Sequence, residues 1–206
     1  MSLGGVWWRT RKQSPHLDQE MGSRSALIGV ENSKPFIAAL ACPLDLSRSL
    51  LFVTPMTVEE KIAGLGLTLP QAAAPVAAYV PTVEAGGLLH ISGQLPFDDG
   101  QLMTGRLGED RDLAYGVKAA ERCALMLIAQ MKLALGNLER VERIVKLSAF
   151  VNSAADFTDQ PKVANGASEL MEQLFGEAGR HARSAVGVAV LPRGAAVEVD
   201  AIVAVR

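Results

Sequence analysis

Two charged residues stand inside otherwise apolar, strand-like sequence near the C-terminal end of the chain. Arg183 opens the first of two predicted strands, Glu198 lies early in the second, and a tight turn is expected at Leu191-Pro-Arg-Gly194. Burying a charge is costly unless something pairs with it. An arginine can hold a planar carboxylate with two parallel hydrogen bonds. The pattern predicts a hairpin with a site for a small carboxylate, although a structural ion pair between Arg183 and Glu198 would explain it equally well.

The composition is that of a globular protein and excludes several classes of partner. The chain has 206 residues, of which 49% are hydrophobic and 20% charged, with a formal net charge of -2. That charge provides no general basic field, so we expect no nucleic-acid partner. Cys42 and Cys123 do not form a disulfide framework, and the three histidines lack zinc-ligand spacing. We expect no metal, no cofactor and a reducing, cytoplasmic location. No apolar run approaches the roughly 20 residues of a membrane span, so we expect no membrane partner.

The composition changes near Pro55, which divides the chain into an N-terminal extension, residues 1–55, and a domain, residues 56–206. The extension has no sustained hydrophobic periodicity, so we expect a disordered or loosely attached tail. Two other interpretations stay open. The biological start could be Met56, with a non-native extension before it, or a signal segment could end at Cys42.

Within the domain, hydrophobic periodicity predicts a short helix followed by the order β-β-α-β-α-β-β. The expected elements are a helix at 58–64, strands at 76–83 and 88–95, a helix from about 112 to 135, a strand at 141–151, a helix at 163–175 and the C-terminal hairpin. Crossovers through helices favour parallel strand pairs, whereas the terminal hairpins are antiparallel. The predicted fold class is therefore α+β, with a mixed sheet and both long helices on one face.

The second face of this sheet would be left uncovered. The strand at 141–151 is apolar on both alternations, with Ile144, Leu147 and Phe150 on one count and Val145, Ala149 and Val151 on the other. Large apolar surfaces of this kind mark interaction sites. A homo-oligomer is the simplest source of a cover, and clefts between subunits are natural places for a ligand.

Six blocks of sequence lie along the domain from about residue 57 to 206: Tyr79-Val-Pro-Thr-Val, Leu89-His-Ile-Ser-Gly-Gln-Leu-Pro96, Lys146-Leu-Ser-Ala-Phe-Val151, Arg183-Ser, Leu191-Pro192 and Val197-Glu-Val-Asp-Ala-Ile202. In order and spacing they resemble the RidA/YjgF family, also called endoribonuclease L-PSP. The resemblance implies a chorismate-mutase-like fold. It also implies a homotrimer whose sheets pack together inside, with ligand sites in the three clefts between subunits.

The resemblance further implies hydrolysis of reactive enamine or imine intermediates, such as 2-aminoacrylate, to 2-keto acids and ammonia. On the family's pattern, Arg183 binds the substrate carboxylate and Glu198 positions or activates the attacking water. This assignment fits the chemistry, because such a hydrolysis needs an anchor for the carboxylate, a positioned water and a route for protons. Gly187 stands where archetypal members often have a glutamate, which indicates a divergent subgroup.

The remaining pocket positions each have a structural interpretation beside the functional one. The resemblance places Tyr79, Gly93 and Asn165 in the substrate-binding pocket, with Ser92 beside Gly93, and Ala185 where archetypal members have a cysteine. Tyr79 could equally be an interface aromatic, Gly93 could mark a bulge, and Asn165 could cap a helix. Since the family's cysteine acts mainly through its backbone, Ala185 is compatible with activity.

Two other functions compete with this hydrolysis. A non-catalytic module that binds small carboxylates would need Arg183 but not Glu198. A ribonuclease, as the older family name implies, would need a basic groove interleaved with aromatic side chains, and the sequence offers none.

Overall fold

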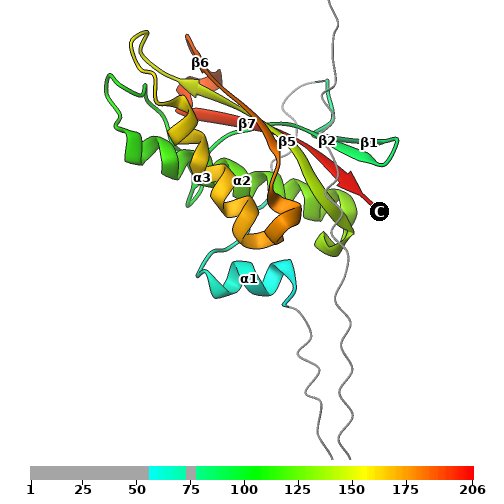
Figure 1. Cartoon of the computed structure of the whole chain (residues 1–206). Helices are drawn as coiled ribbons and strands as arrows, with labels where there is room; N and C mark the ends of the chain where they lie inside the picture. Colours follow the sequence, from blue (N-terminus) through cyan, green and yellow to red (C-terminus); the bar gives the residue numbers. More distant parts are fainter. Residues whose placement is uncertain (1–55, 73–77) are drawn as a thin grey trace, which may run out of the picture. The chain divides into compact units, whose positions relative to one another are not determined.

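The computed structural model describes residues 56–72 and 78–206, so the predicted extension at 1–55 lies outside the described part. Its centre is a five-stranded sheet in the order β1-β2-β7-β5-β6, formed by Thr82–Ala85, Leu88–Gln94, Val197–Val205, Val141–Asn152 and Ala182–Val188. Helices α2 (Leu113–Leu135) and α3 (Gln160–Phe175) cover one face of this sheet (Figure 1). The predicted α+β class, with a mixed sheet and both long helices on one face, is confirmed.

The helices begin and end where local signals predict. Helix α1 (Val58–Gly64) starts with a capping box, in which Thr57 and Glu60 each accept the other's backbone N–H. Asp112 caps the start of α2, and Gly136 ends it in the left-handed conformation, with φ at 72°. Among these helices, none is both long enough and apolar enough to cross a membrane. Local chemistry therefore sets the lengths of α1 and α2.

Two short hairpins form at glycine-containing turns. β1 and β2 pair antiparallel around Gly86 and Gly87, whose φ angles are both positive. β1 begins at Thr82 rather than near residue 76, and residues 73–77 of that predicted strand lie outside the described part. A turn at Asp99 and Gly100, both with positive φ, joins two short strands, β3 (Phe97–Asp98) and β4 (Gln101–Leu102), which form a separate small sheet.

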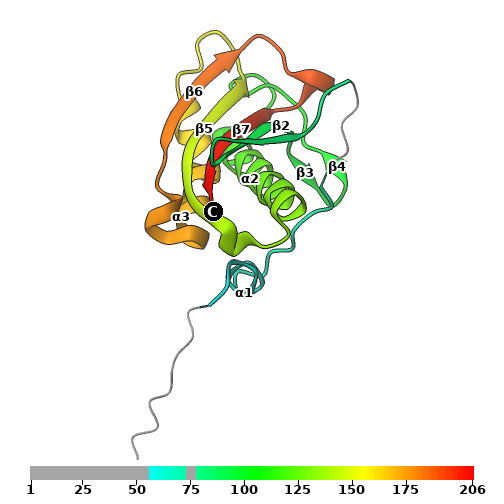
Figure 2. The same cartoon turned by 90° about the vertical axis from the view of Figure 1, so that its right-hand side faces the viewer.

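The C-terminal strands do not form the predicted hairpin. The turn is present, since the Gly194 N–H donates to the Leu191 carbonyl at 3.0 Å, but β5 lies between β6 and β7 (Figure 2). β5 pairs parallel with β6 and antiparallel with β7. β5 is the longest strand and is apolar enough to pair on both edges, so β6 becomes an edge strand. The charged residues of β6 and β7 are therefore separated by a whole strand.

A register shift in β5 corrects the predicted division of its faces. The pairing of β5 with β7 is irregular between Ile144 and Lys146, so Ile144 and Leu147 both face the helices and are buried. Ala149 is buried on the same side, whereas Phe150 points to the opposite face. The helix-facing side of β5 therefore combines residues from both predicted sets: Ile144 and Leu147 from one, and Ala149 from the other.

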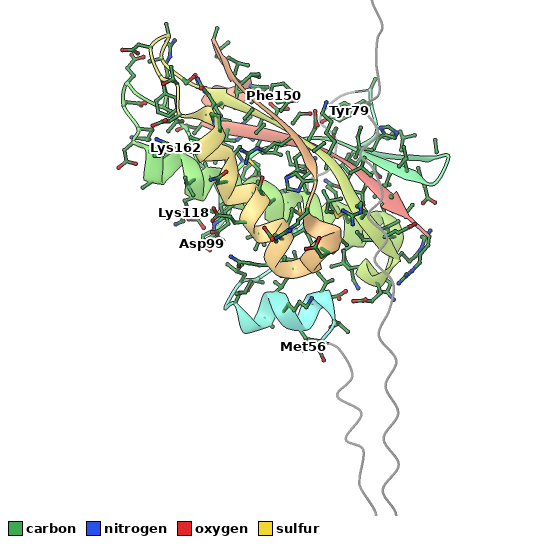
Figure 3. All side chains as sticks on the ribbon, in the orientation of Figure 1. Met56, Tyr79, Asp99, Lys118, Phe150 and Lys162 are labelled. Carbon is green, nitrogen blue, oxygen red and sulfur yellow. The ribbon has the colours of Figure 1, made fainter. Side chains whose placement is uncertain are left out.

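The face opposite the helices is partly apolar, and no helix or strand of the described residues covers it. Phe150 pairs in register with Val186 on β6, and Figure 3 shows Phe150 on the side of the sheet away from α2 and α3. Val186 is 47% exposed, and Val83 on β1 is 50% exposed. Side chains of this kind are accessible for contact with another protein surface.

Candidate functional site

Arg183 is held by three hydrogen bonds to helix α3. It lies on β6 opposite Leu147, on the side of the sheet that the helices cover. Its Nη1 donates to Asn165 Oδ1 at 2.9 Å and to Ser168 Oγ at 3.0 Å, and its Nη2 donates to the Pro161 carbonyl at 3.1 Å. A guanidinium carries five N–H donors. Nε–H and one Nη2–H have no acceptor among the described residues, so two donors on neighbouring nitrogens remain for a ligand carboxylate.

Asn165 has a different structural role from the helix cap that the sequence suggested as an alternative. It lies inside α3, whose N-cap is Asp159, so the helix-cap interpretation is wrong. Its side chain instead orients Arg183, which is two strand positions before Ala185 on β6. Ala185 packs against the core opposite Ala149. The structure thus brings three of the predicted site residues, Arg183, Asn165 and Ala185, to one edge of the sheet.

Ser168 and His181 join this group and were not predicted as site residues. Ser168 Oγ lies 3.0 Å from His181 Nε2, and His181 Nδ1 lies 2.6 Å from the Gly179 carbonyl. The sequence did contain a signal. Ser168 is three positions after Asn165, which puts both on one face of a helix, and His181 is two positions before Arg183, which puts both on one face of a strand.

Glu198 is a half-buried carboxylate without a compensating partner. It lies on β7 opposite Phe150, on the face away from the helices. No hydrogen bond or ion pair to its side chain occurs within the described part of the chain. Burial raises the pKa of the Glu198 carboxyl, and the nearby Asp200 raises it further. A carboxylate kept less acidic and unpaired is suited to accepting a proton from water.

Gly93 provides the surface against which Glu198 lies. A Cβ at position 93 would stand 1.8 Å from Glu198 Oε1 and 2.7 Å from its Cδ, so only glycine leaves room for this carboxylate. The bulge interpretation is also correct, because the β2–β7 register shifts between Ile91 and Gln94. Gln94 Nε2 donates to the carbonyls of Ser92 and Gly93 at 3.0 and 3.3 Å, which stabilises the bulge.

Ser92 and Tyr79 lie near this second group. The Ser92 N–H donates to the Pro81 carbonyl at 3.0 Å, and its buried Oγ has no hydrogen-bond partner within residues 56–72 and 78–206. Tyr79 lies three residues before the start of β1 and is 48% exposed. Figure 3 labels its side chain. The structure therefore gathers Ser92, Gly93 and Glu198 on the face away from the helices, and Tyr79 lies two residues before Pro81, whose carbonyl Ser92 contacts.

The two groups do not meet within one chain. Neighbouring strands are about 4.8 Å apart, so β6 and β7 are separated by about twice that distance across β5. Arg183 faces the helices and Glu198 faces the opposite side, and none of the ion pairs among the described residues joins them. The structural ion-pair interpretation therefore fails for a single chain. Each charge is left to serve a ligand or another subunit.

Gly187 shows how this chain differs near the first group. A Cβ there would stand 2.7 Å from Ser153 Oγ and 2.8 Å from Gln160 Nε2, so a glutamate could not replace it without movement of both side chains. A hollow of about 640 Å³ lies between residues 66–71, β3–β4 and α2, and no predicted site residue lines it. No group of three metal-binding side chains occurs in residues 56–72 and 78–206. The free donors of Arg183 suit carboxylate binding, and the carboxylate of Glu198 suits proton transfer.

Comparison with known proteins agrees with this geometry. The YjgF/chorismate mutase-like family model, whose members are candidate endoribonucleases, matches residues 59–203. The protein TCP17 of Trypanosoma cruzi is 56% identical over 148 residues, which cover 71% of this chain and 92% of that protein. A 2-iminobutanoate/2-iminopropanoate deaminase of Dermatophagoides farinae is 25% identical over 143 residues, which cover 68% of this chain and 95% of that protein.

Solved structures give the same result. The protein Atu1372 of Agrobacterium tumefaciens, of unknown function, has a TM-score of 0.69 and 48% identity, with 72% of this chain and 92% of that chain covered. The predicted resemblance is confirmed along the described domain. Because the family model spans residues 59–203 and a relative with 56% identity covers most of the domain, the chain belongs to the YjgF/RidA family.

Proposed function

We propose that the protein hydrolyses reactive enamine or imine intermediates of the 2-aminoacrylate type to 2-keto acids and ammonia. The observation that carries this proposal is a pair of groups that lack partners among the described residues: Arg183 keeps two free donors there, and Glu198 is unpaired there and has a raised pKa. The name of the mite relative, a 2-iminobutanoate/2-iminopropanoate deaminase, supports the same chemistry.

In the proposed reaction, Arg183 holds the substrate carboxylate and fixes the adjacent C=N carbon. Glu198 accepts a proton from a water molecule as the water oxygen adds to that carbon. The C=N π electrons move to nitrogen, which takes a proton from solvent. Glu198 then returns its proton to the carbinolamine nitrogen, the C–N bond breaks with its electron pair on nitrogen, and the hydroxyl proton passes to the Glu198 carboxylate and on to solvent as the 2-keto acid and ammonia form. General acid–base catalysis of this kind needs a group whose pKa is near the working pH, which a raised carboxyl pKa favours.

We further propose that the site lies between subunits of a homotrimer. Arg183 and Glu198 face opposite sides of one sheet, so a single substrate can touch both only if they come from different copies. The apolar side chains on the Glu198 face, such as the exposed Val186 and the half-buried Phe150, provide the contact surface for the neighbouring copy. That the number of subunits is three is what the family resemblance implies.

Turnover of 2-aminoacrylate tests the proposal. The substrate is generated in situ by a serine dehydratase, and keto acid release is compared for the wild type, Arg183→Ala and Glu198→Gln. We expect acceleration by the wild type alone. Lys162→Ala is the control, because Lys162 is exposed on α3 and pairs only with Asp159 among the described residues. Equal acceleration by the wild type and Arg183→Ala would refute the role of the arginine.

A non-catalytic carboxylate-binding function uses the same two free donors of Arg183 and predicts a different result. Glu198→Gln would then bind a 2-keto acid such as pyruvate as tightly as the wild type, and the wild type would not accelerate hydrolysis. Calorimetric titration with pyruvate, measured beside the turnover assay, separates the two functions.

A further inference from the structure

We propose that His181 and Ser168 form a relay that positions the guanidinium of Arg183, and that the relay works only while His181 is neutral. Both act as positioning residues, since Ser168 contacts Arg183 and His181 acts on Arg183 through Ser168. The inference rests on the proposed function for its kinetic effect, but the relay itself has a signature that is independent of turnover.

With His181 neutral, hydrogen-bonding chemistry allows one arrangement of protons along the relay. The Gly179 carbonyl can only accept, so His181 Nδ1, 2.6 Å away, must carry a proton. In a neutral imidazole the other nitrogen, Nε2, is then an acceptor, and the Ser168 hydroxyl donates to it across 3.0 Å. Arg183 Nη1 can only donate, so it donates to Ser168 Oγ. Each donor meets an acceptor from Arg183 to the Gly179 carbonyl.

The relay determines which donors of Arg183 are left for a ligand. With Ser168 and Asn165 both bound to Nη1 and the Pro161 carbonyl bound to Nη2, the guanidinium is fixed from three directions. Without the Ser168 acceptor, one Nη1–H is released and the group can rotate about its remaining contacts. A carboxylate anchored by two parallel bonds is sensitive to such rotation, because both donors must point at it together.

Protonation of His181 would disturb this arrangement. The Nε2–H of an imidazolium would point at Ser168 Oγ and force the hydroxyl proton to turn away. It would also place a second positive charge near Arg183. Burial lowers the pKa of His181 and Arg183 lowers it further, whereas the Gly179 carbonyl and Glu172 act in the opposite direction. These effects favour the neutral imidazole at neutral pH.

Charged residues from α3, from the segment after it and from β5 lie near His181 in the fold. Glu172 on α3 and Glu177 after it both pair with Arg180, at 2.8 and 3.2 Å. From β5, Arg143 donates to the Arg180 carbonyl at 3.0 Å. A hollow of about 350 Å³ beside the relay is lined by Ser168, Glu172, Gly179, Arg180, His181 and Arg183. Glu172 and Glu177 are both paired with Arg180. The charged group that is linked to His181 through Ser168 is therefore the guanidinium of Arg183.

The first test is the tautomer of His181, measured in the whole protein by ¹⁵N-resolved NMR of the imidazole. We expect a neutral ring protonated at Nδ1, with a pKa below the usual 6.5 that rises in Arg183→Ala. A ring protonated at Nε2, or a pKa unchanged by Arg183→Ala, would overturn the relay. This test does not need turnover, so its outcome is independent of whether the proposed hydrolysis is correct.

The second test separates KM from kcat. Ser168→Ala and His181→Ala should each raise KM about tenfold with little change in kcat, since each loses one hydrogen bond that orients a charged donor. His181→Gln offers an amide oxygen to Ser168 without titrating, so it should keep the wild-type KM at neutral pH and lose the rise of KM at acid pH. Wild-type KM in Ser168→Ala, or an acid rise of KM that persists in His181→Gln, would overturn the proposal. Lys162→Ala controls for general effects of mutating α3.

Discussion

Substitution of Gly93 by alanine isolates the contribution of Glu198 without removing its carboxylate. The new Cβ would stand 1.8 Å from Glu198 Oε1, whereas ordinary contact begins at 3.4 Å, so the carboxylate must move by about 1.6 Å. A misplacement of about 1 Å can cost roughly 100-fold in rate. We therefore expect Gly93→Ala to lower kcat by about 100-fold and to leave KM nearly unchanged, because Arg183 on the other side of the sheet is not disturbed.

The predicted effect on stability is small, which separates this result from misfolding. The atoms nearest the added Cβ all belong to the flexible Glu198 side chain, so the fold can adjust at a cost of about 1 kcal/mol or less. Gly64→Ala is the matched control, because a Cβ there has its nearest neighbour, Met56 Cε, at 4.0 Å. Steady-state kinetics and thermal unfolding of both variants supply the two measurements. An unchanged kcat in Gly93→Ala would refute the placement of Glu198 at the reacting water.

A double mutant sharpens the same argument. Glu198→Asp retracts the carboxylate by one methylene, away from the added methyl group at position 93. In the wild-type background this change should lower kcat, because the carboxylate withdraws from the water. In the Gly93→Ala background it should cost much less or restore rate, which a double-mutant cycle would record as a favourable coupling. Strictly additive losses would show that the two residues act separately.

Three further predictions concern stability and reactivity. Glu198→Gln should raise Tm at neutral pH. The folded-state pKa of Glu198 is raised, so the ionised carboxylate destabilises the folded state above that pKa. The gain in Tm from the uncharged amide should therefore vanish below the usual pKa of 4.5. An equal gain at all pH values would contradict this. Gly166→Ala should destabilise the protein by about 3 kcal/mol in denaturant unfolding, since its Cβ would stand 2.0 Å from the Val117 backbone oxygen; wild-type stability would refute the close approach of α3 to α2. Burial raises the pKa of the Cys123 thiol, so in a Cys42→Ser background a thiol reagent should react only after unfolding, and reaction in the native state would contradict its burial.

Local chemistry made much of the fold predictable from sequence. The bounds of α1 and the C-terminal end of α2 follow from a capping box and from Gly136, whose signals lie within a few residues of the helix ends. The position of β5 between β6 and β7 depends instead on which distant strands pair. Turn residues at 191–194 indicate only that the chain reverses. The interchange of faces in β5 likewise needed the register shift near Lys146, which no local pattern reveals.

The candidate site was predictable in its residues but not in its geometry. Arg183 and Glu198 stand out because each is a charge in apolar strand sequence, and the structure gives both an environment suited to chemistry. The relay through Ser168 was missed because it depends on how α3 is rotated over β6, a tertiary property. The separation of the two charges across β5 was also not expected, because the sequence predicted a hairpin that would place them on neighbouring strands. The proposed activity therefore requires two copies of the chain.

Complementation between two inactive variants tests the central claim most directly. Arg183→Ala and Glu198→Gln are co-expressed with different tags, mixed oligomers are isolated, and 2-aminoacrylate hydrolysis is measured. If Arg183 of one copy and Glu198 of another form each site, the isolated mixed trimers should recover about one third of the wild-type rate, because in a cyclic trimer with two copies of one variant and one of the other, one interface in three carries both intact residues. Mixed oligomers as inactive as either parent would contradict a site shared between subunits.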